Sequence, residues 1–584
     1  MHLVLGPAPR SADRPAGTWW AVPDDDTSVT TPLAEFVLAE VADVVLALPQ
    51  RLGVEPERVR WCAASLEELS RPCLTAGVRL ARGWDLALCQ RILRTAASSE
   101  SAGLTYAPTV ELAVADPAAV PASPIRRVPE GQEAFFDVAA ADEPELPDVH
   151  QLRTELHAQL AAVAASAHPP RLTLLLAAES QGALIAEEIH AAGLPWDAQL
   201  HARLLEQRLG PRPQEGKRPA RLQELADQLA RQLGVSEVNP DSPPSVLRAL
   251  HQAGVTVEST RQWDLQAWVE AGGTEREQRA ALIEPLLQYK KLSRLFTANG
   301  WHWLDAWVQD RRFHARYLVG GVVTGRWSAH GGGAMQIPAG VREAVTADPG
   351  WLLTVADASQ VEPRILAAMS QDVALAAAGS TPDLYTEVAE QGRAAGTSLA
   401  DRSRAKVALL GAMYGATTGD SAALLPHLRR LYPHALELLE TAAAAGERGG
   451  QVSTWLGRVS PAPTQAWRDT VQRQSSQAEE SRARQLRRAA GRFTRNFVVQ
   501  GTAAEWALCW MGEIRRRLVQ QGCTTALVFF VHDEVVLHGP AAEAEQVRAV
   551  VAESASAAGR LLFGAAPVDF PLTVSSVECY ADAK

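Results

Sequence analysis

One segment near the C-terminal end, Val531-His532-Asp533-Glu534-Val535, constrains this chain more than any other. It lies between two apolar runs, 526–530 and 536–537, and Gly539-Pro540 follows the second run. Runs rich in β-branched and aromatic residues that end at glycine and proline are typical of strands, so we expect a hairpin with His532 and Asp533 at its tight turn. Acidic residues between such strands indicate a site; the alternative is an ordinary charged turn. A site requires a second carboxylate alongside Asp533.

Length and charge limit what such a site binds. At 584 residues the chain is too long for one core, and we expect roughly three to four domains. With a formal net charge of −11, any nucleic-acid surface must be a local basic groove. The six cysteines form no C-x-x-C pair, which argues against structural zinc and a disulfide framework. We find no signal peptide and no apolar run long enough to span a membrane, so we expect a soluble, cytoplasmic protein.

The order of the patterns divides the chain. Over the first 165 or so residues, apolar runs such as 18–22 alternate with helical patterns at 33–48 and 86–93, which predicts a small α/β domain. A segment from about Ser98 to Val149, rich in Pro, Ala, Ser and acidic residues, then indicates a long loop. Helical periodicity between about 172 and 308 predicts an elongated arm.

A second carboxylate closes another apolar run, 351–356, which ends at Asp357. We expect that run to be a buried strand, followed by a helix that begins near Pro363. A mixed sheet would bring Asp357 and Asp533 to one edge. Paired carboxylates are the hard oxygen ligands that Mg²⁺ prefers, and they leave coordination positions open for substrate phosphates.

The predicted helix that begins near residue 401 carries Arg402, Lys406, Leu410 and Tyr414 at every fourth position and ends at Gly415. This spacing puts the four side chains on one helix face. Two cations followed by an aromatic ring suit a face that holds a polyphosphate at one end and stacks a base at the other. The alternative is a solvated charged face beside a core Leu and Tyr.

Lysine at position 406 is informative because lysine is rare here. Of the 56 Lys and Arg residues, the lysines are only Lys217, Lys290, Lys291, Lys406 and Lys584. A compact ammonium is able to give up a proton, whereas a guanidinium is not. We therefore predict that Lys406 is the general acid for a departing pyrophosphate.

A basic cluster follows on the helical pattern 465–521. Its arginines are Arg482, Arg484, Arg487, Arg488, Arg492 and Arg495. Arg492, Asn496 and Gln500 recur at every fourth position, and long polar donors on one face suit phosphates and base edges of nucleic acid. The alternative is an exposed amphipathic helix, but the small apolar segment after Gln500 does not continue an exposed surface.

Together these segments resemble the family A DNA polymerases, the DNA polymerase I-like enzymes. Three motifs of that family match Asp357-Ala358-Ser359-Gln360-Val361-Glu362-Pro363-Arg364, Arg402-x3-Lys406-x3-Leu410-x3-Tyr414-Gly415 and Val531-His532-Asp533-Glu534-Val535. Further family segments match, in the family's order, Thr324-Gly325-Arg326-Trp327-Ser328, Gln336-Ile337-Pro338 and Asn496-x3-Gln500-Gly501-Thr502-Ala503-Ala504. The resemblance extends from about residue 170 to the C-terminal end.

The resemblance implies an α+β right-hand polymerase fold with palm, fingers and thumb, preceded by a small α/β ribonuclease H-like, exonuclease-type domain. We expect the exonuclease-like domain at 1–168, the thumb at 169–317, the palm at 318–400 and 496–584, and the fingers at 401–495. We expect no 5′-nuclease domain of the kind that longer relatives carry.

The resemblance also assigns roles. Asp357 and Asp533, aided by the backbone carbonyl of Ala358, would bind two Mg²⁺ ions, with Mn²⁺ as a substitute. Lys406 and Glu534 would join the two aspartates as catalytic residues. The expected deoxynucleotide contacts are Arg402, Lys406, Leu410, Tyr414, Gln360 and Glu362, with Glu362 excluding a 2′-hydroxyl. The expected contacts to primer–template DNA are Arg326, Arg492, Asn496, Gln500 and His532. We expect a monomer with no membrane partner.

Several positions depart from the family. Leu410 stands where the family has an aromatic residue that packs on the incoming sugar, which bears on sugar discrimination. Pro363 replaces an apolar residue, and Met335 replaces a polar one. In the N-terminal domain, family relatives carry an Asp-x-Glu metal site on the first strand of the exonuclease. Here the run 18–23 is followed by Asp24-Asp25-Asp26, beyond the strand.

Asp85 is the one candidate remnant of a later exonuclease motif. A two-metal nuclease without its central carboxylates is inactive, so we predict a structural platform without proofreading. The activity that we expect is template-directed DNA synthesis. One alternative is a phage-type RNA polymerase, which Glu362 and Glu534 disfavour. The other is a catalytically inert DNA-binding relative. The retention of Asp357, Asp533, Arg402 and Lys406 argues against that alternative.

Overall fold

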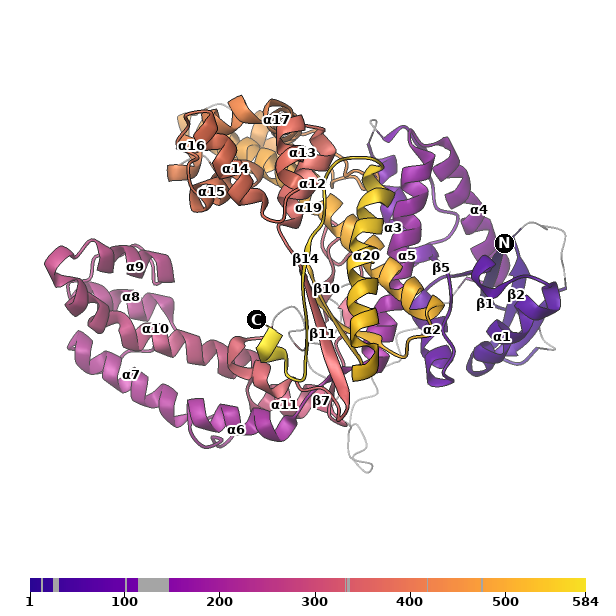
Figure 1. The fold of residues 1–584 in the computed structure, drawn as a ribbon, viewed down its shortest axis with the longest axis horizontal. Coiled ribbons are helices and arrows are strands. Elements are labelled where there is room, and N and C mark those ends of the chain that lie inside the picture. The colour runs from indigo at the N-terminus through magenta and orange to yellow at the C-terminus, as the bar shows by residue number, and fades with distance from the viewer. Residues whose placement is uncertain are drawn as a thin grey trace.

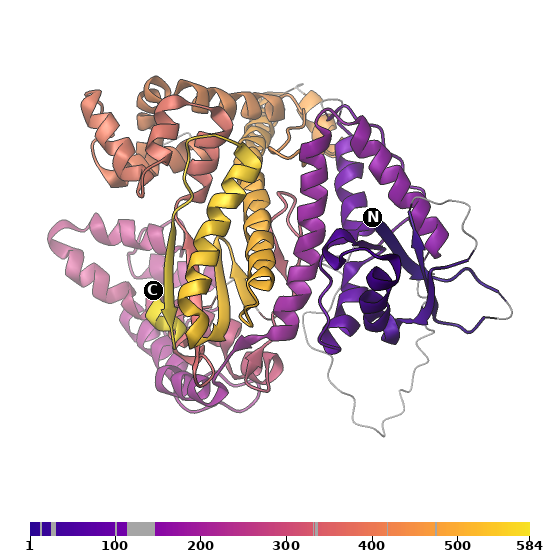
Figure 2. The ribbon, with the colours of Figure 1, turned by 45° about the vertical axis from the view of Figure 1, so that its right-hand side comes forward.

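The computed structural model describes residues 1–11, 14–24, 31–99, 102–113, 147–330, 332, 337–416, 419–473 and 476–583. Asp25, Asp26, Met335 and Gln336, and most of the loop predicted after residue 98, lie outside these residues. Figures 1 and 2 show an N-terminal domain on one side of a central sheet, with a helical arm and a cluster of helices extending on the other side.

The N-terminal domain contains a mixed sheet with strand order β3-β2-β1-β4-β5. Its strands are β1 (His2–Pro7), β2 (Thr18–Pro23), β3 (Ala34–Val37), β4 (Arg60–Ala63) and β5 (Gly83–Asp85). Its helices are α1 (Val41–Leu52), α2 (Leu66–Thr75), α3 (Leu86–Ala97) and α4 (Val149–Ala165).

Two expectations for this domain are wrong. The run 18–23 is not the first strand, because β1 precedes it and pairs with both β2 and β4. The segment 33–48 is not one helix either, since its first residues form β3 against β2. The edge strand β3 is joined to α1 by only a short 3₁₀ turn, so its buried side continues the helical pattern of α1. Sequence periodicity therefore does not separate the strand from the helix.

The helical arm follows the long helix α5 (Pro169–Ala192). Its helices are α6 (Ala198–Leu209), α7 (Ala220–Leu233), α8 (Pro243–Gln252), α9 (Gln262–Glu270), α10 (Arg276–Asn299) and α11 (Trp301–Trp307). Short strands β6 (Leu194–Pro195), β7 (Val308–Gln309) and β8 (Arg312–Phe313) close its base. The far end of the arm has a hydrophobic core of its own, between α7 and α10 (Figure 1).

The central sheet has the order β12-β13-β11-β14 and is antiparallel throughout, so the expected mixed sheet is wrong. Its strands are β11 (Trp351–Ala358), β12 (Ala526–Val531), β13 (Glu534–Pro540) and β14 (Leu572–Val577). The strand-like segment at 318–326 forms only a small ribbon of β9 (Tyr317–Leu318) and β10 (Ser328–Ala329). The hydroxyl of Tyr317 satisfies the outer edge of β12, because it donates to the carbonyl of Phe530 and accepts from its N–H.

Helices cover this sheet and extend beyond it. The cluster contains α12 (Val361–Ser370), α13 (Val373–Gly379), α14 (Leu384–Ala394), α15 (Arg402–Tyr414), α16 (Gly419–Leu431), α17 (Pro433–Glu447) and α18 (Gln465–Gln472). The 44-residue helix α19 (Gln477–Gln520) links the cluster to the sheet, where α20 (Ala544–Phe563) packs beside it (Figure 2).

Two arginines, buried Arg515 and half-buried Arg91, fasten the N-terminal domain to the rest of the chain. Arg515 on α19 forms an ion pair with Glu188 on α5 and donates to the backbone carbonyls of Leu80 and Ala81. Arg91 on α3 reaches the carbonyl of Val319 at 3.0 Å. A domain held by such directed, partly buried contacts is not a loosely tethered module.

Candidate active site

The predicted hairpin is confirmed, and it carries the first half of the site. Val531 of β12 and Glu534 of β13 are paired, so His532 and Asp533 form a two-residue turn. His532 adopts the left-handed conformation, with φ of 57°, which such a tight turn requires. Both residues line a cavity, with Asp533 partly buried and His532 exposed.

Asp357 lies beside this turn. On β11 it is opposite Glu534 of β13, and the backbone N–H of the next residue, Ala358, donates to the carbonyl of Asp533 at 3.0 Å. The two predicted carboxylates are therefore on adjacent strands at one edge of the sheet. Burial raises the pKa of Asp533, and the nearby Arg326 guanidinium partly offsets that effect. Two aspartates at one sheet edge supply oxygen ligands of the kind that Mg²⁺ prefers.

Glu534 has a different environment from that of the two aspartates. Its side chain is 2% exposed, and its Oε1 accepts a hydrogen bond from the hydroxyl of Tyr580 at 2.5 Å. Burial and this carboxylate together raise the pKa of Tyr580 well above its ordinary value. Glu534 thus ties the hairpin to the C-terminal segment.

Helix α15 presents the predicted face opposite the sheet edge. Arg402, Lys406 and Tyr414 are exposed and Leu410 is half-buried, whereas Ala405 and Leu409 face the interior and are buried. Asp401 caps the helix by accepting from the N–H of Arg404, and Gly415 ends it in the left-handed conformation. Lys406 has no hydrogen-bond or ion-pair partner within the described residues.

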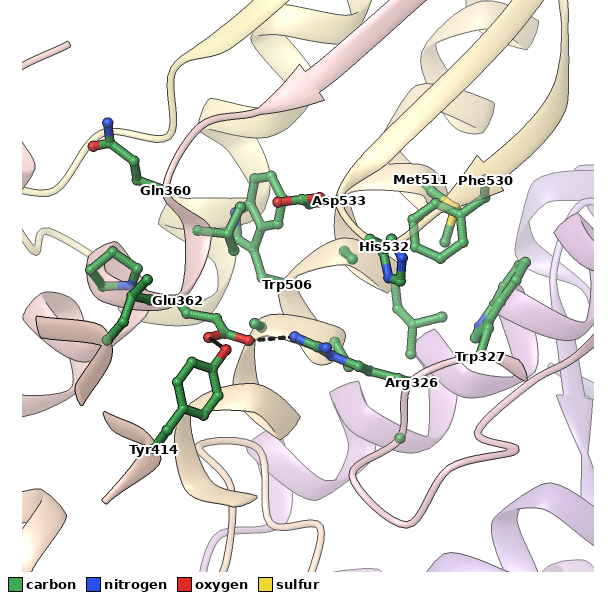
Figure 3. Close-up of a pocket in the computed structure, with 18 of the residues that line it drawn as sticks. Arg326, Trp327, Gln360, Glu362, Tyr414, Trp506, Met511, Phe530, His532 and Asp533 are labelled. Atoms are coloured by element: carbon green, nitrogen blue, oxygen red, sulfur yellow. Dashed lines mark hydrogen bonds and ion pairs between the residues drawn. The ribbon is translucent and has the colours of Figure 1, made fainter. Parts of the chain in front are cut away.

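Glu362 on α12 joins the sheet edge to α15. Its Oε2 accepts from the hydroxyl of Tyr414 at 2.6 Å, and its Oε1 pairs with Nη2 of Arg326 at 2.5 Å. Burial and the carboxylate raise the pKa of Tyr414 above its ordinary value. Figure 3 shows the three side chains converging below Asp533 and His532, whereas Gln360 points away from them.

A cavity of about 290 Å³ lies between these groups. Its polar lining includes Arg326, Glu362, Asp533 and Tyr414. Its apolar lining includes Trp327, Trp506, Leu508, Met511 and Phe530. A cavity with both polar and apolar walls fits a ligand that combines charge with a flat or aliphatic body.

The predicted nucleic-acid helix is the middle of α19. Arg492 is exposed, and Asn496 and Gln500 are half-buried. Within the cluster, Arg495 instead donates to the carbonyl of Ala412 at the end of α15, so it serves the packing of the two helices. The small segment 501–504 is buried, as its composition predicts.

Residues that we did not predict also reach the site. Asp383 and Tyr385 at the start of α14 contact Arg402, and Trp506 and Met511 are apolar residues that line the cavity. The Thr-Pro-Asp sequence before α14 is a helix-start signal and thus carries no sign of a site. Trp506 and Met511 read as core residues in a helical pattern.

The structure has an antiparallel sheet with two aspartates at its edge, a cationic helix that faces them and a helical arm at its side. This arrangement defines the right-hand polymerase class. The chain is similar in fold to the solved POL domain of Pol1 from M. smegmatis in complex with DNA primer-template and dNTP. The TM-score is 0.65 at 19% identity, over 97% of this chain and 93% of that one.

The chain belongs to DNA polymerase family A, because the model of that family matches residues 212–577. It is 31% identical over 319 residues to the thermostable DNA polymerase I of Thermus filiformis, an alignment that covers 50% of this chain and 35% of the relative. It is 30% identical over 310 residues to DNA polymerase I of Mycobacterium tuberculosis (strain CDC 1551 / Oshkosh), covering 50% and 32% respectively. The chain thus spans about a third of the length of these curated relatives. Across the described residues, no helix combines the length and apolar character needed to cross a membrane.

Proposed function

We propose that this protein carries out template-directed DNA synthesis, adding deoxynucleotides to a primer 3′-hydroxyl in the 5′→3′ direction. The observation that carries the proposal is the main-chain hydrogen bond from Ala358 to Asp533, which places Asp357 and Asp533 at one sheet edge, opposite the cationic face of α15. The partners would be primer–template DNA and deoxynucleoside triphosphates, and the protein would act as a monomer in the cytoplasm.

The donor set at the sheet edge fits divalent metal ions. Asp357, Asp533 and the backbone carbonyl of Ala358 supply hard oxygen ligands, and a site with few protein ligands leaves positions for substrate phosphates, as Mg²⁺ requires. We propose that these residues hold two Mg²⁺ ions, for which Mn²⁺ would substitute. When bound, the ions would lower the pKa of the primer hydroxyl and stabilise the charge that develops on the phosphates.

The chain's own residues would place the substrates around that edge. Arg402 and Lys406 would hold the triphosphate, and Lys406 would give a proton to the departing pyrophosphate. Glu362, held by Tyr414 and Arg326, would close the space next to the sugar 2′ position. Leu410 would leave that space wider than an aromatic residue does.

The remaining predicted contacts would serve the DNA. Arg326, Arg492, Asn496, Gln500 and His532 would contact primer–template, with cations at phosphates and amides at base edges. Because Glu534 is buried against Tyr580, we propose that it positions the hairpin rather than touching the substrate.

We also propose that the N-terminal domain does not proofread. Its sheet order is that of a ribonuclease H-like domain, but the central strand β1, His2–Pro7, carries no carboxylate. Both oxygens of Asp85 accept backbone N–H groups, from Leu66 and from Leu88, each at 2.9 Å. A carboxylate used in this way binds the first turns of α2 and α3, and at 3% exposure it serves their packing rather than a metal.

Primer extension tests the proposal. The wild-type chain should extend a labelled primer on a defined template with dNTPs and Mg²⁺, and extension should stop when Mg²⁺ is chelated. Asp533→Asn, which keeps the shape of the side chain, should lose at least about a hundredfold in rate, since a metal contributes several kcal/mol to such a transition state. If the folded wild-type chain fails to extend the primer, the proposal is wrong. Faster extension with rNTPs than with dNTPs would instead favour RNA synthesis.

A further inference from the structure

Asp383, which the sequence did not single out, lies at the triphosphate end of the site. Its Oδ2 accepts from Nε of Arg402 at 2.6 Å, and its Oδ1 accepts from Nε2 of Gln360 at 2.8 Å. It also caps α14 by accepting from the N–H groups of Tyr385 and Thr386. Burial opposes ionisation here, but the hydrogen bonds from Arg402, Thr386 and Gln360 lower the pKa of Asp383 to about 2. The carboxylate is therefore charged at neutral pH.

The surrounding fold fixes Asp383 in place. Arg364 is fully buried and donates to the carbonyl of Gly379 at the end of α13 and to those of Thr381 and Pro382 in the loop that leads into α14. Gln360 completes the support, since its Oε1 accepts from the N–H of Leu384 at 2.9 Å. Asp383 is thus held by the loop before it and by Gln360, which lies two residues after the end of β11.

Arg402 is oriented by two contacts that leave its ends available. Asp383 binds its Nε, and the ring of Tyr385 lies under the guanidinium, with 5.7 Å between Cζ and the ring centroid. Its Nη groups have no hydrogen-bond partner among the residues that the structure describes. Without these contacts a side chain that is 53% exposed would sample many rotamers, and a ligand would have to order it.

We propose that Asp383 is a positioning residue that orients Arg402, through Nε, to present its two Nη groups to the polyphosphate of the substrate. Asp383 itself does not contact the substrate, because its carboxylate would repel phosphate. The inference rests on the proposed role of Arg402 as a triphosphate ligand. It also predicts that Gln360, three residues after Asp357, helps to orient Arg402 through its hydrogen bond to Asp383.

Asp383 could instead be only a helix cap, and the variant Asp383→Asn separates the two roles. Asparagine caps a helix about as well as aspartate, so α14 should keep its stability, whereas the negative charge that binds Nε of Arg402 is lost. Asp197→Asn is the matched control, because Asp197 is the cap of α6, where it accepts from the N–H of Leu200 at 2.8 Å, in the arm and away from Arg402.

The test is calorimetric titration of inorganic tripolyphosphate, with Mg²⁺, into wild type, Asp383→Asn, Arg402→Ala, the double variant and Asp197→Asn. We expect Asp383→Asn to weaken binding by about three- to tenfold, as for the loss of an exposed but well-oriented ion pair. The same substitution should have no further effect in the Arg402→Ala background, which a double-mutant cycle detects. Asp197→Asn should bind as the wild type does, and thermal midpoints should be unchanged.

Three results would overturn the proposal. The first is that Asp383→Asn binds tripolyphosphate as tightly as the wild type or more tightly, and the second is that it loses the same affinity in the Arg402→Ala background. The third is that the wild type shows no saturable binding. In primer extension, Asp383→Asn should raise KM for dNTP while kcat is largely retained. Because tripolyphosphate binding needs neither primer nor template, a chain that binds it in the expected pattern but makes no DNA would contradict the proposed function and leave this inference standing.

Discussion

The backbone N–H of Ala358 donates a hydrogen bond to the backbone carbonyl of Asp533, with 3.0 Å between the nitrogen and the oxygen. This bond joins the end of β11 to the hairpin turn between β12 and β13. Asp357 and Asp533 are therefore brought together by the main chain of a packed sheet, rather than by flexible loops. Sites built on strands hold their geometry more closely than sites on loops.

Lys406→Arg should separate binding from turnover. Both side chains are cationic, so the KM for dNTP should change by less than about threefold, but arginine is not able to give up a proton and kcat should fall by about a hundredfold. Steady-state kinetics at a saturating primer–template concentration measure both constants. A parallel loss in 1/KM and kcat would show that Lys406 contributes charge alone.

Glu362→Ala should relax sugar selection. Removing this carboxylate empties the space beside Leu410 and frees both Tyr414 and Arg326. We expect the ratio of ribonucleotide to deoxynucleotide incorporation to rise by about ten- to hundredfold, the range in which a shaped pocket discriminates. Tyr414→Phe is the matched variant, because it removes only the hydroxyl that binds Glu362. If selection stays unchanged in Glu362→Ala, another group excludes the 2′-hydroxyl.

Asp85→Ala should destabilise the N-terminal domain without altering any nuclease activity. The substitution leaves the N–H groups of Leu66 and Leu88 without their acceptor inside the protein, and we expect a loss of about 2–4 kcal/mol in unfolding free energy. Urea unfolding measures this loss, and digestion of a mismatched 3′ end with Mg²⁺ is the second readout. Metal-dependent digestion by the wild type that disappears in the variant would refute the platform role.

His201 should make stability depend on pH. It is fully buried, with Trp196 donating to its Nδ1 and its Nε2 directed at the carbonyl of Asn299, and burial lowers its pKa to about 4. The unfolded state, with a pKa near 6.5, binds the proton first as the pH falls. The stability is therefore complete above about pH 6.5 and should decrease by roughly 2–3 kcal/mol as the pH falls to about 4.5.

His201→Gln should remove that part of the pH dependence, whereas substitution of the exposed His434 by Gln should not. Urea unfolding at about pH 7 and about pH 4.5, followed by tryptophan fluorescence, gives the comparison. An unchanged pH dependence in His201→Gln would assign the effect to other histidines, such as half-buried His190 and buried His538, whose pKa values burial also lowers to about 4.

The sequence by itself determined the local parts of the site. The two-residue turn at His532 and Asp533, the strand that ends near Asp357 and the shared face of Arg402, Lys406 and Tyr414 all follow from side-chain periods of two or of 3.6 residues. These features depend on neighbours along the chain, and the structure has them where the patterns predict. The order of the motifs then supplied the family.

Only the tertiary structure decided which of these parts meet, and by which contacts. It set the antiparallel order of the sheet and the buried pairing of Glu534 with Tyr580. It also set the contacts of Asp383 with Arg402 and Gln360. In each case the local sequence does not indicate which residue the partner is. An aspartate before a helix has the same pattern whether it only caps that helix or also orients an arginine on the next one. The physical reason is that such contacts arise from the packing of whole elements, and packing depends on the total buried surface rather than on any local period.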